Sequence, residues 1–114
     1  MAIFIKTSTP NKLLTDIKSQ IKNGQIDSWS VDKDGDFTHN VTQWRYKAWL
    51  RPHVEEGRLV MGILCRTDKN ISVSEYAIYH GRFVEMILSH FDNWCSDIIT
   101  TAMPTKYDTI SNSK

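Results

Sequence analysis

The sequence predicts a two-layer α+β domain, in which a mostly antiparallel sheet carries two helices on one face. Three observations indicate this class. Two segments, one near the start and one in the last third of the chain, place apolar residues at helical spacing. Between them, residues 26–66 alternate polar and apolar side chains. Turn residues interrupt that alternation, so the expected order of elements is β-α-β-β-β-β-α.

The first two elements are a strand and a helix. A short apolar run predicts the strand at residues 2–6. Thr9 and Pro10 form a typical helix start, with Thr as the N-cap and Pro at the first helical position. We expect a helix over residues 10–23, ended by Gly24, because apolar residues recur there at helical spacing. These residues are Leu13, Leu14, Ile17 and Ile21.

The middle of the chain is expected to supply four strands. Asp34-Gly35 is a strong hairpin signal, and it separates alternating segments at 26–31 and 37–41. The next strand is expected at 44–54. Residues 59–65 are almost wholly apolar, which is typical of a central strand covered on both faces.

A long second helix is expected at about 74–101, because Ser72 and Glu75 fit a capping box. Its apolar side is wide for a helix that covers one sheet face. The residues on that side are Tyr76, Tyr79, His80, Phe83, Met86, Ile87, His90, Phe91, Trp94 and Ile98. Either the first helix packs beside this surface or a second copy does, so a homodimer is one of the two expectations.

The chain divides into one domain and a tail. Its 114 residues suit a single hydrophobic core. From Pro104 onward the sequence is polar, interrupted only by Tyr107 and Ile110. We therefore expect an α+β domain over residues 1–103 and a flexible C-terminal tail over 104–114.

Composition narrows the classes of function. The chain has 14 Lys and Arg against 13 Asp and Glu, a net charge of +1, which disfavours a strongly basic nucleic-acid binder. The N-terminal segment resembles no secretion signal, and no window approaches the roughly 18 apolar residues that span a bilayer. We expect a cytoplasmic protein without a membrane partner, in which Cys65 and Cys95 are reduced thiols.

A basic and aromatic stripe is the main candidate site. If residues 44–54 form a strand, alternate side chains lie on the same side of it. On one side these are Arg45, Lys47, Trp49, Arg51 and His53, and Arg58 begins the next strand. An open sheet face of this kind could bind an acidic protein, with Trp49 as an aromatic anchor. It could instead bind nucleic acid through phosphate contacts and base stacking, or simply be a solvated surface.

An enzyme is the third interpretation, with a pocket between the sheet and the long helix. It would use His80 or His90 together with Tyr79. The two histidines are ten residues apart, about 15 Å along a helix, so they cannot share one metal ion. No complete catalytic motif accompanies them, which favours a binding or regulatory module over an enzyme.

The acidic run at residues 32–36 resembles the opening of a calcium loop, with Asp32, Asp34 and Asp36 at alternating positions. The resemblance then ends, because Phe37 stands where such a loop needs Gly and Gln43 where it needs Glu. The pattern favours an acidic hairpin tip, and we expect no metal site and no cofactor.

Overall fold

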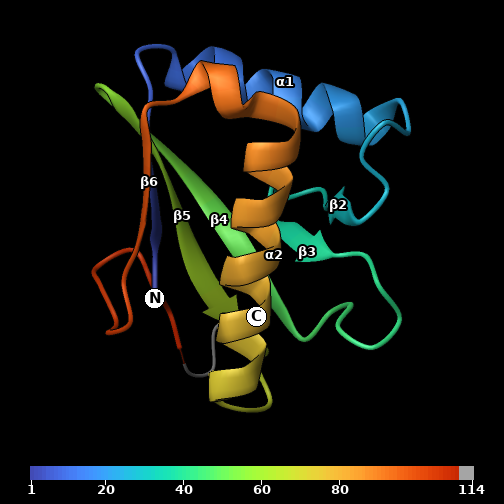
Figure 1. The fold of residues 1–114 in the computed structure, drawn as a ribbon. Coiled ribbons are helices and arrows are strands. Elements are labelled where there is room, and N and C mark those ends of the chain that lie inside the picture. The colour runs from blue at the N-terminus through green and yellow to red at the C-terminus, as the bar shows by residue number, and fades with distance from the viewer. Residues whose placement is uncertain (111–114) are drawn as a thin grey trace.

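The computed structural model describes residues 1–110 and confirms the two-layer α+β class. Six strands form one antiparallel sheet in the order β2-β3-β4-β5-β1-β6, and two helices cover one of its faces (Figure 1). The strands are β1 (Ile3–Lys6), β2 (Trp29–Val31), β3 (Phe37–His39), β4 (Ala48–Glu55), β5 (Arg58–Cys65) and β6 (Asp97–Thr100). The helices are α1 (Pro10–Lys22), α2 (Val73–Phe91) and the short 3-10 helix η1 (Asp92–Trp94).

The core lies between the helices and one face of the sheet. Leu13 and Ile17 of α1 are fully buried there, as the periodicity of that helix predicts. Phe83 of α2 reaches into an aromatic cluster, with its ring 5.2 Å from Trp29 and 5.9 Å from Phe37. Because these rings come from α2, β2 and β3, the cluster fixes the long helix against the outer part of the sheet.

The second helix begins as predicted but ends earlier. Ser72 accepts a hydrogen bond from the Glu75 backbone, and the Glu75 side chain accepts one from Ser72, which completes the capping box. The helix ends at Phe91, so the expectation of a helix to residue 101 is wrong. Residues 97–100 instead form β6, which pairs with β1 and adds a strand to the predicted order. Branched side chains in that segment favour a strand over a helix.

The strand that was expected at 44–54 begins only at Ala48. The residues before it turn back on themselves, because Trp44 N–H donates to Val41 at 2.8 Å and Lys47 N–H donates to Trp44 at 3.2 Å. Arg45 and Lys47 therefore lie outside the sheet, and the predicted alternation does not apply to them. We call residues 41–47 the 41–47 loop.

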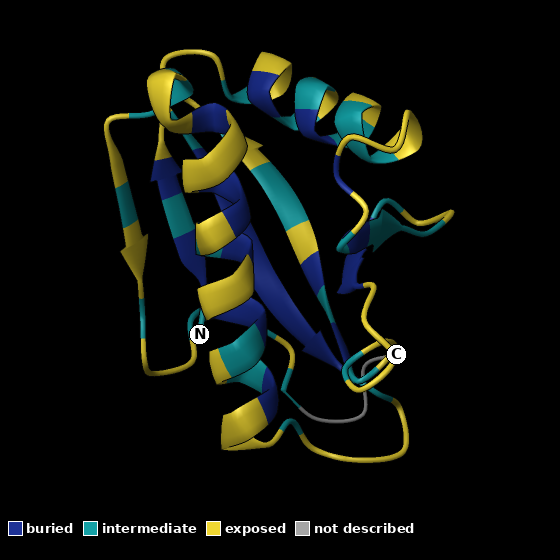
Figure 2. Cartoon of the chain, turned by 45° about the vertical axis from the view of Figure 1, so that its right-hand side comes forward, coloured by how far each residue is buried: buried dark blue, intermediate teal, exposed yellow. Residues whose placement is uncertain are grey.

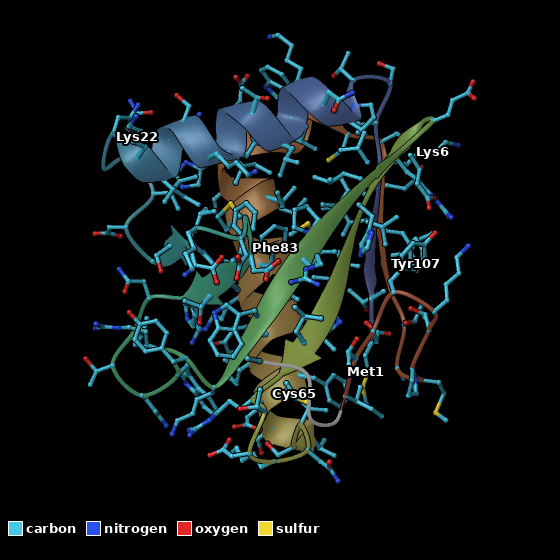
Figure 3. All side chains as sticks on the ribbon, turned by 180° about the vertical axis from the view of Figure 1, so that it is seen from behind. Met1, Lys6, Lys22, Cys65, Phe83 and Tyr107 are labelled. Atoms are coloured by element: carbon cyan, nitrogen blue, oxygen red, sulfur yellow. The ribbon has the colours of Figure 1, made fainter. Side chains whose placement is uncertain are left out.

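Residues 104–110, in the segment predicted to be a flexible tail, contact β5. Thr109 exchanges backbone hydrogen bonds of 2.9 and 3.0 Å with Ile63 and Cys65, and the Asp108 carboxylate accepts the Ile63 N–H at 2.9 Å. Figure 3 shows Tyr107 on the face of the sheet away from α2. The end of the predicted tail, 111–114, lies outside the described residues.

A helix long and apolar enough to cross a membrane is not found in the described part of the chain.

Candidate partner-binding site

Two of the six predicted site residues are engaged in ion pairs within the chain. Arg51 donates two hydrogen bonds to the buried Asp36, at 2.9 and 2.8 Å. Arg58 donates to Glu55 at 2.7 Å, and its guanidinium lies 4.8 Å from the ring of Phe4. The hydrogen bonds to Asp36 and Glu55 raise the pKa of the respective arginines. Both charges are thus largely compensated before any partner arrives.

His53 and Trp49 lie on the sheet face away from the helices, but that face is partly covered. The ring of Tyr107 lies 5.2 Å from the ring of His53, and the Tyr107 hydroxyl donates to Glu55. This hydrogen bond is the main reason why the pKa of Glu55 is lowered. Trp49 is half-buried and has contacts of its own. The C-terminal segment therefore occupies part of the surface that the sequence predicts to be open.

The remaining two residues, Arg45 and Lys47, lie on either side of Tyr46 in the 41–47 loop. Neither makes an ion pair with any residue between 1 and 110. Tyr46 is 58% exposed and has a φ of 62°, a left-handed conformation that no other non-glycine residue in the described chain adopts. That conformation costs a side chain on the order of 1 kcal/mol, so the surrounding structure must impose it.

Hydrogen bonds to buried hydroxyl groups impose the left-handed conformation of Tyr46. The Tyr46 N–H donates to the hydroxyl of Thr38 at 3.1 Å, and the Tyr79 hydroxyl donates to the Trp44 carbonyl. The two hydroxyls lie 2.9 Å apart inside the molecule. Burial raises the pKa of Tyr79, so this hydroxyl keeps its proton and the hydrogen bond that depends on it. The loop is thereby tied to both β3 and α2.

A pocket of about 380 Å³ lies beside the 41–47 loop, between that loop and α2. Its polar residues come from both sides, and they are Ser28, His39, Gln43, Arg82, Glu85, Ser89 and His90. His39 Nδ1 lies 2.8 Å from the Ser28 carbonyl, so that nitrogen carries the proton. Burial lowers the pKa of His39, which keeps the ring neutral and leaves Nε2 as a hydrogen-bond acceptor.

The histidines and Tyr79 that the sequence predicts for an enzyme pocket do not line one pocket together. His90 lines the pocket, but Tyr79 holds the loop, and the two ring nitrogens of His80 face the carbonyls of Tyr76 and Met1. The three residues are thus not brought together. His39 is not among the site residues predicted from the sequence, although a polar residue at an inward position of an alternating strand is a signal for such a site.

The acidic hairpin tip is held by its own hydrogen bonds. Carboxylate oxygens of Asp32, Asp34 and Asp36 lie within 4.8 Å of one another. One Asp32 oxygen accepts the N–H groups of Asp34 and Asp36 at 2.9 and 3.0 Å, and Arg51 engages both oxygens of Asp36. A guanidinium at this position competes with any cation for the same oxygens, so the cluster is explained as a stabilised turn.

Comparison with known proteins finds no match to a family model, to a curated protein or to a solved structure. Function is therefore inferred from the geometry of the site.

Proposed function

We propose that this chain is a protein-interaction module that binds an acidic partner through the 41–47 loop. Tyr46 would be the aromatic anchor, and Arg45 and Lys47 the cations that orient the partner. The observation that carries the proposal is the exposed side chain of Tyr46 in a left-handed backbone conformation on a loop held by buried hydrogen bonds. This is a modified form of the interaction predicted from the sequence, moved from the sheet face to the loop.

Folding alone does not explain a tyrosine at position 46. Glycine adopts this backbone conformation without a steric penalty, and an exposed ring adds little to the core. Binding does explain it, because tyrosine and arginine are enriched among residues that dominate interface energies. A loop already held in its binding conformation also loses less entropy when a partner docks.

Charge supports an acidic partner. Arg45 and Lys47 lack the carboxylate neighbours that Arg51 and Arg58 have among the described residues, so a carboxylate from outside can compensate them. Nucleic acid is the weaker choice, because its affinity comes from neutralising many phosphates and the loop offers two cations. The pocket beside the loop adds polar lining residues, among them Gln43 and Arg82, that a partner could contact.

The proposal can be tested with random-sequence peptides displayed on phage and selected on the purified protein. We expect the selected peptides to be rich in Asp and Glu. Tyr46→Gly and the double variant Arg45→Glu/Lys47→Glu should each weaken binding by about tenfold or more, roughly 1.4 kcal/mol. Tyr46→Gly should leave the free energy of unfolding unchanged or raise it, because it relieves the backbone strain.

Lys22→Glu is the control for charge reversal, because it reverses one exposed charge at the end of α1, where the double variant reverses two. It should leave peptide binding unchanged. Peptides without acidic residues, or binding that survives Tyr46→Gly, would refute the proposal. Preferential binding of a single-stranded oligonucleotide, with affinity falling steeply as salt rises, would replace it with a nucleic-acid role.

A further inference from the structure

Strand β6 is an outer strand of the sheet with one side unpaired. It pairs with β1 on its inner side, where Thr101 N–H donates to Ala2 at 3.0 Å and Ile99 lies opposite Phe4. Because alternate residues of an antiparallel pair share hydrogen bonds, the backbone groups of Ile98 and Thr100 point to the outer side. No strand pairs with that side within residues 1–110. Figure 2 shows β6 as a largely exposed strand at the edge of the sheet.

Apart from Asp97, this edge lacks the charges and prolines that usually prevent pairing. Proteins protect outer strands with charged residues, proline, bulges or a covering segment. Residues 98–103 contain neither a charge nor a proline. Ile99 is 60% exposed, and Met103, which follows the strand, is 75% exposed, so β6 and the residues after it present apolar side chains to the outside. A second strand could add here through main-chain hydrogen bonds.

We propose that β6 pairs with β6 of a second copy of this chain, antiparallel about a two-fold axis that passes beside Ile99. In this register the outward backbone groups of Ile98 meet those of the partner's Thr100, and the reverse pair follows by symmetry. Ile99 lies opposite the partner's Ile99 at a non-hydrogen-bonded position, with Cα atoms about 4.5 Å apart. The two sheets then form one continuous sheet.

The side chains on both faces suit a second copy. On the face away from the helices, Ile99 lies beside Phe4, whose ring is 5.8 Å from that of Tyr107. In the proposed dimer, this apolar row lies next to the same row of the second copy. On the helix face, a groove of about 470 Å³ separates α2 from the end of β6 and is lined by Ala77, Val84 and Thr100. The partner's Ile98 would lie opposite Thr100, at the mouth of this groove.

The charges also permit self-pairing. Asp97 is the charged residue of β6, and in this register it lies opposite the partner's Thr101. The two Asp97 residues are then four positions apart, roughly 13 Å along the strand. That separation exceeds the Debye length of about 8 Å at physiological salt, so their repulsion is screened. The net charge of +1 adds little repulsion between copies.

The dimer leaves the 41–47 loop free. That loop joins β3 to β4, while β6 is at the opposite edge of the sheet from β2 and β3. Each copy therefore keeps its own loop, and a dimer would present two of them. The inference stands independently of the proposed binding role, since loop variants should not change the mass of the assembly.

A cysteine at the two-fold axis tests the register. In a Cys95→Ser background, Ile99→Cys should form a disulfide-linked dimer under mild oxidation. In the proposed register the Cβ atoms of residue 99 in the two copies are neighbours across the axis. The control is Val73→Cys, which places a thiol at a position 73% exposed on α2, away from the axis. It should form no disulfide-linked dimer under the same treatment. Equal crosslinking at both positions would overturn the register.

The oligomeric state of the unmodified chain is the second readout. Light scattering or native mass spectrometry should give a dimer. Ile99→Lys should raise the dissociation constant of the dimer by more than about tenfold, because two like charges then meet at the axis. Circular dichroism of Ile99→Lys should match the parent, since Ile99 is mostly exposed. A monomeric parent chain, or a dimer that survives Ile99→Lys, would overturn the inference.

Discussion

Two glycines in regular secondary structure differ in what surrounds them. A Cβ atom at Gly62, in β5, would lie 2.0 Å from the carbonyl oxygen of Tyr107, so only glycine lets the C-terminal segment cross the sheet there. A Cβ atom at Gly81, in α2, would meet nothing within 4 Å. Gly62 is therefore required by a close backbone approach, whereas Gly81 meets no such requirement from residues 1–110.

Gly62→Ala should destabilise the protein by about 1–3 kcal/mol, because the Tyr107 backbone must move away from β5. Gly81→Ala is its counterpart and should stabilise the protein by about 0.5–1 kcal/mol, since alanine is the better helix residue. Urea unfolding of both variants measures the two effects. A loss of stability with Gly81→Ala would contradict the open space seen beside it.

At the residue level, the sequence could reveal the kinds of side chain at the site but not their partners. A glycine inside an apolar strand is a known sign of a close backbone approach. It does not say that Tyr107 makes that approach, because the contact joins distant parts of the chain. Likewise Arg51 was identified as a cation on β4, but its pairing with Asp36 depends on how β3 and β4 align.

The two helices begin with different caps, and their stability should respond differently. Ser72→Ala removes the hydroxyl that accepts the Glu75 N–H, and should destabilise the protein by about 1 kcal/mol. Thr9→Ala at the start of α1 should have a much smaller effect, because the Thr9 side chain makes no capping hydrogen bond. Thermal unfolding of the two variants distinguishes them, and equal losses would contradict the capping assignment.

The elements defined by local pattern were predictable, and those decided by distant contacts were not. The starts of α1 and α2 follow from local residues at 9–10 and 72–75. The end of α2 was missed because Trp94 and Ile98 continue the helical spacing. The branched residues at 98–101 were the available signal for β6, but its strand state depends on pairing with β1. The turn at 44–47 had no comparable local signal.

Stability of the whole molecule should decrease on mild acidification. Burial lowers the pKa of both His39 and His80 below the ordinary value of 6.5, and at His80 it outweighs the opposing effect of the Tyr76 and Met1 carbonyls. The unfolded chain then binds protons more readily than the folded one, so stability is lost as the pH falls from 6.5 toward the lowered values. Each pKa unit by which a histidine is lowered corresponds to about 1.4 kcal/mol of folding stability lost at low pH.

The urea midpoint at pH 7.5 should exceed that at pH 5.5, a window above the range in which most carboxyl groups titrate. Replacing both histidines with glutamine should flatten this dependence, even if it lowers stability at both pH values. A midpoint that rises on acidification would contradict the buried, neutral state of the two rings.

The position of β1 in the sheet has a consequence for folding during synthesis. Residues 3–6 leave the ribosome well before both neighbours of β1, which are β5 at 58–65 and β6 at 97–100. Of the six strands described, β1 is therefore made first, yet it is among the last to be paired on both sides. Until then its buried side chains, such as Ile3 and Ile5, have no sheet to join. Such delayed, long-range pairing slows folding and leaves apolar surface open to chaperones.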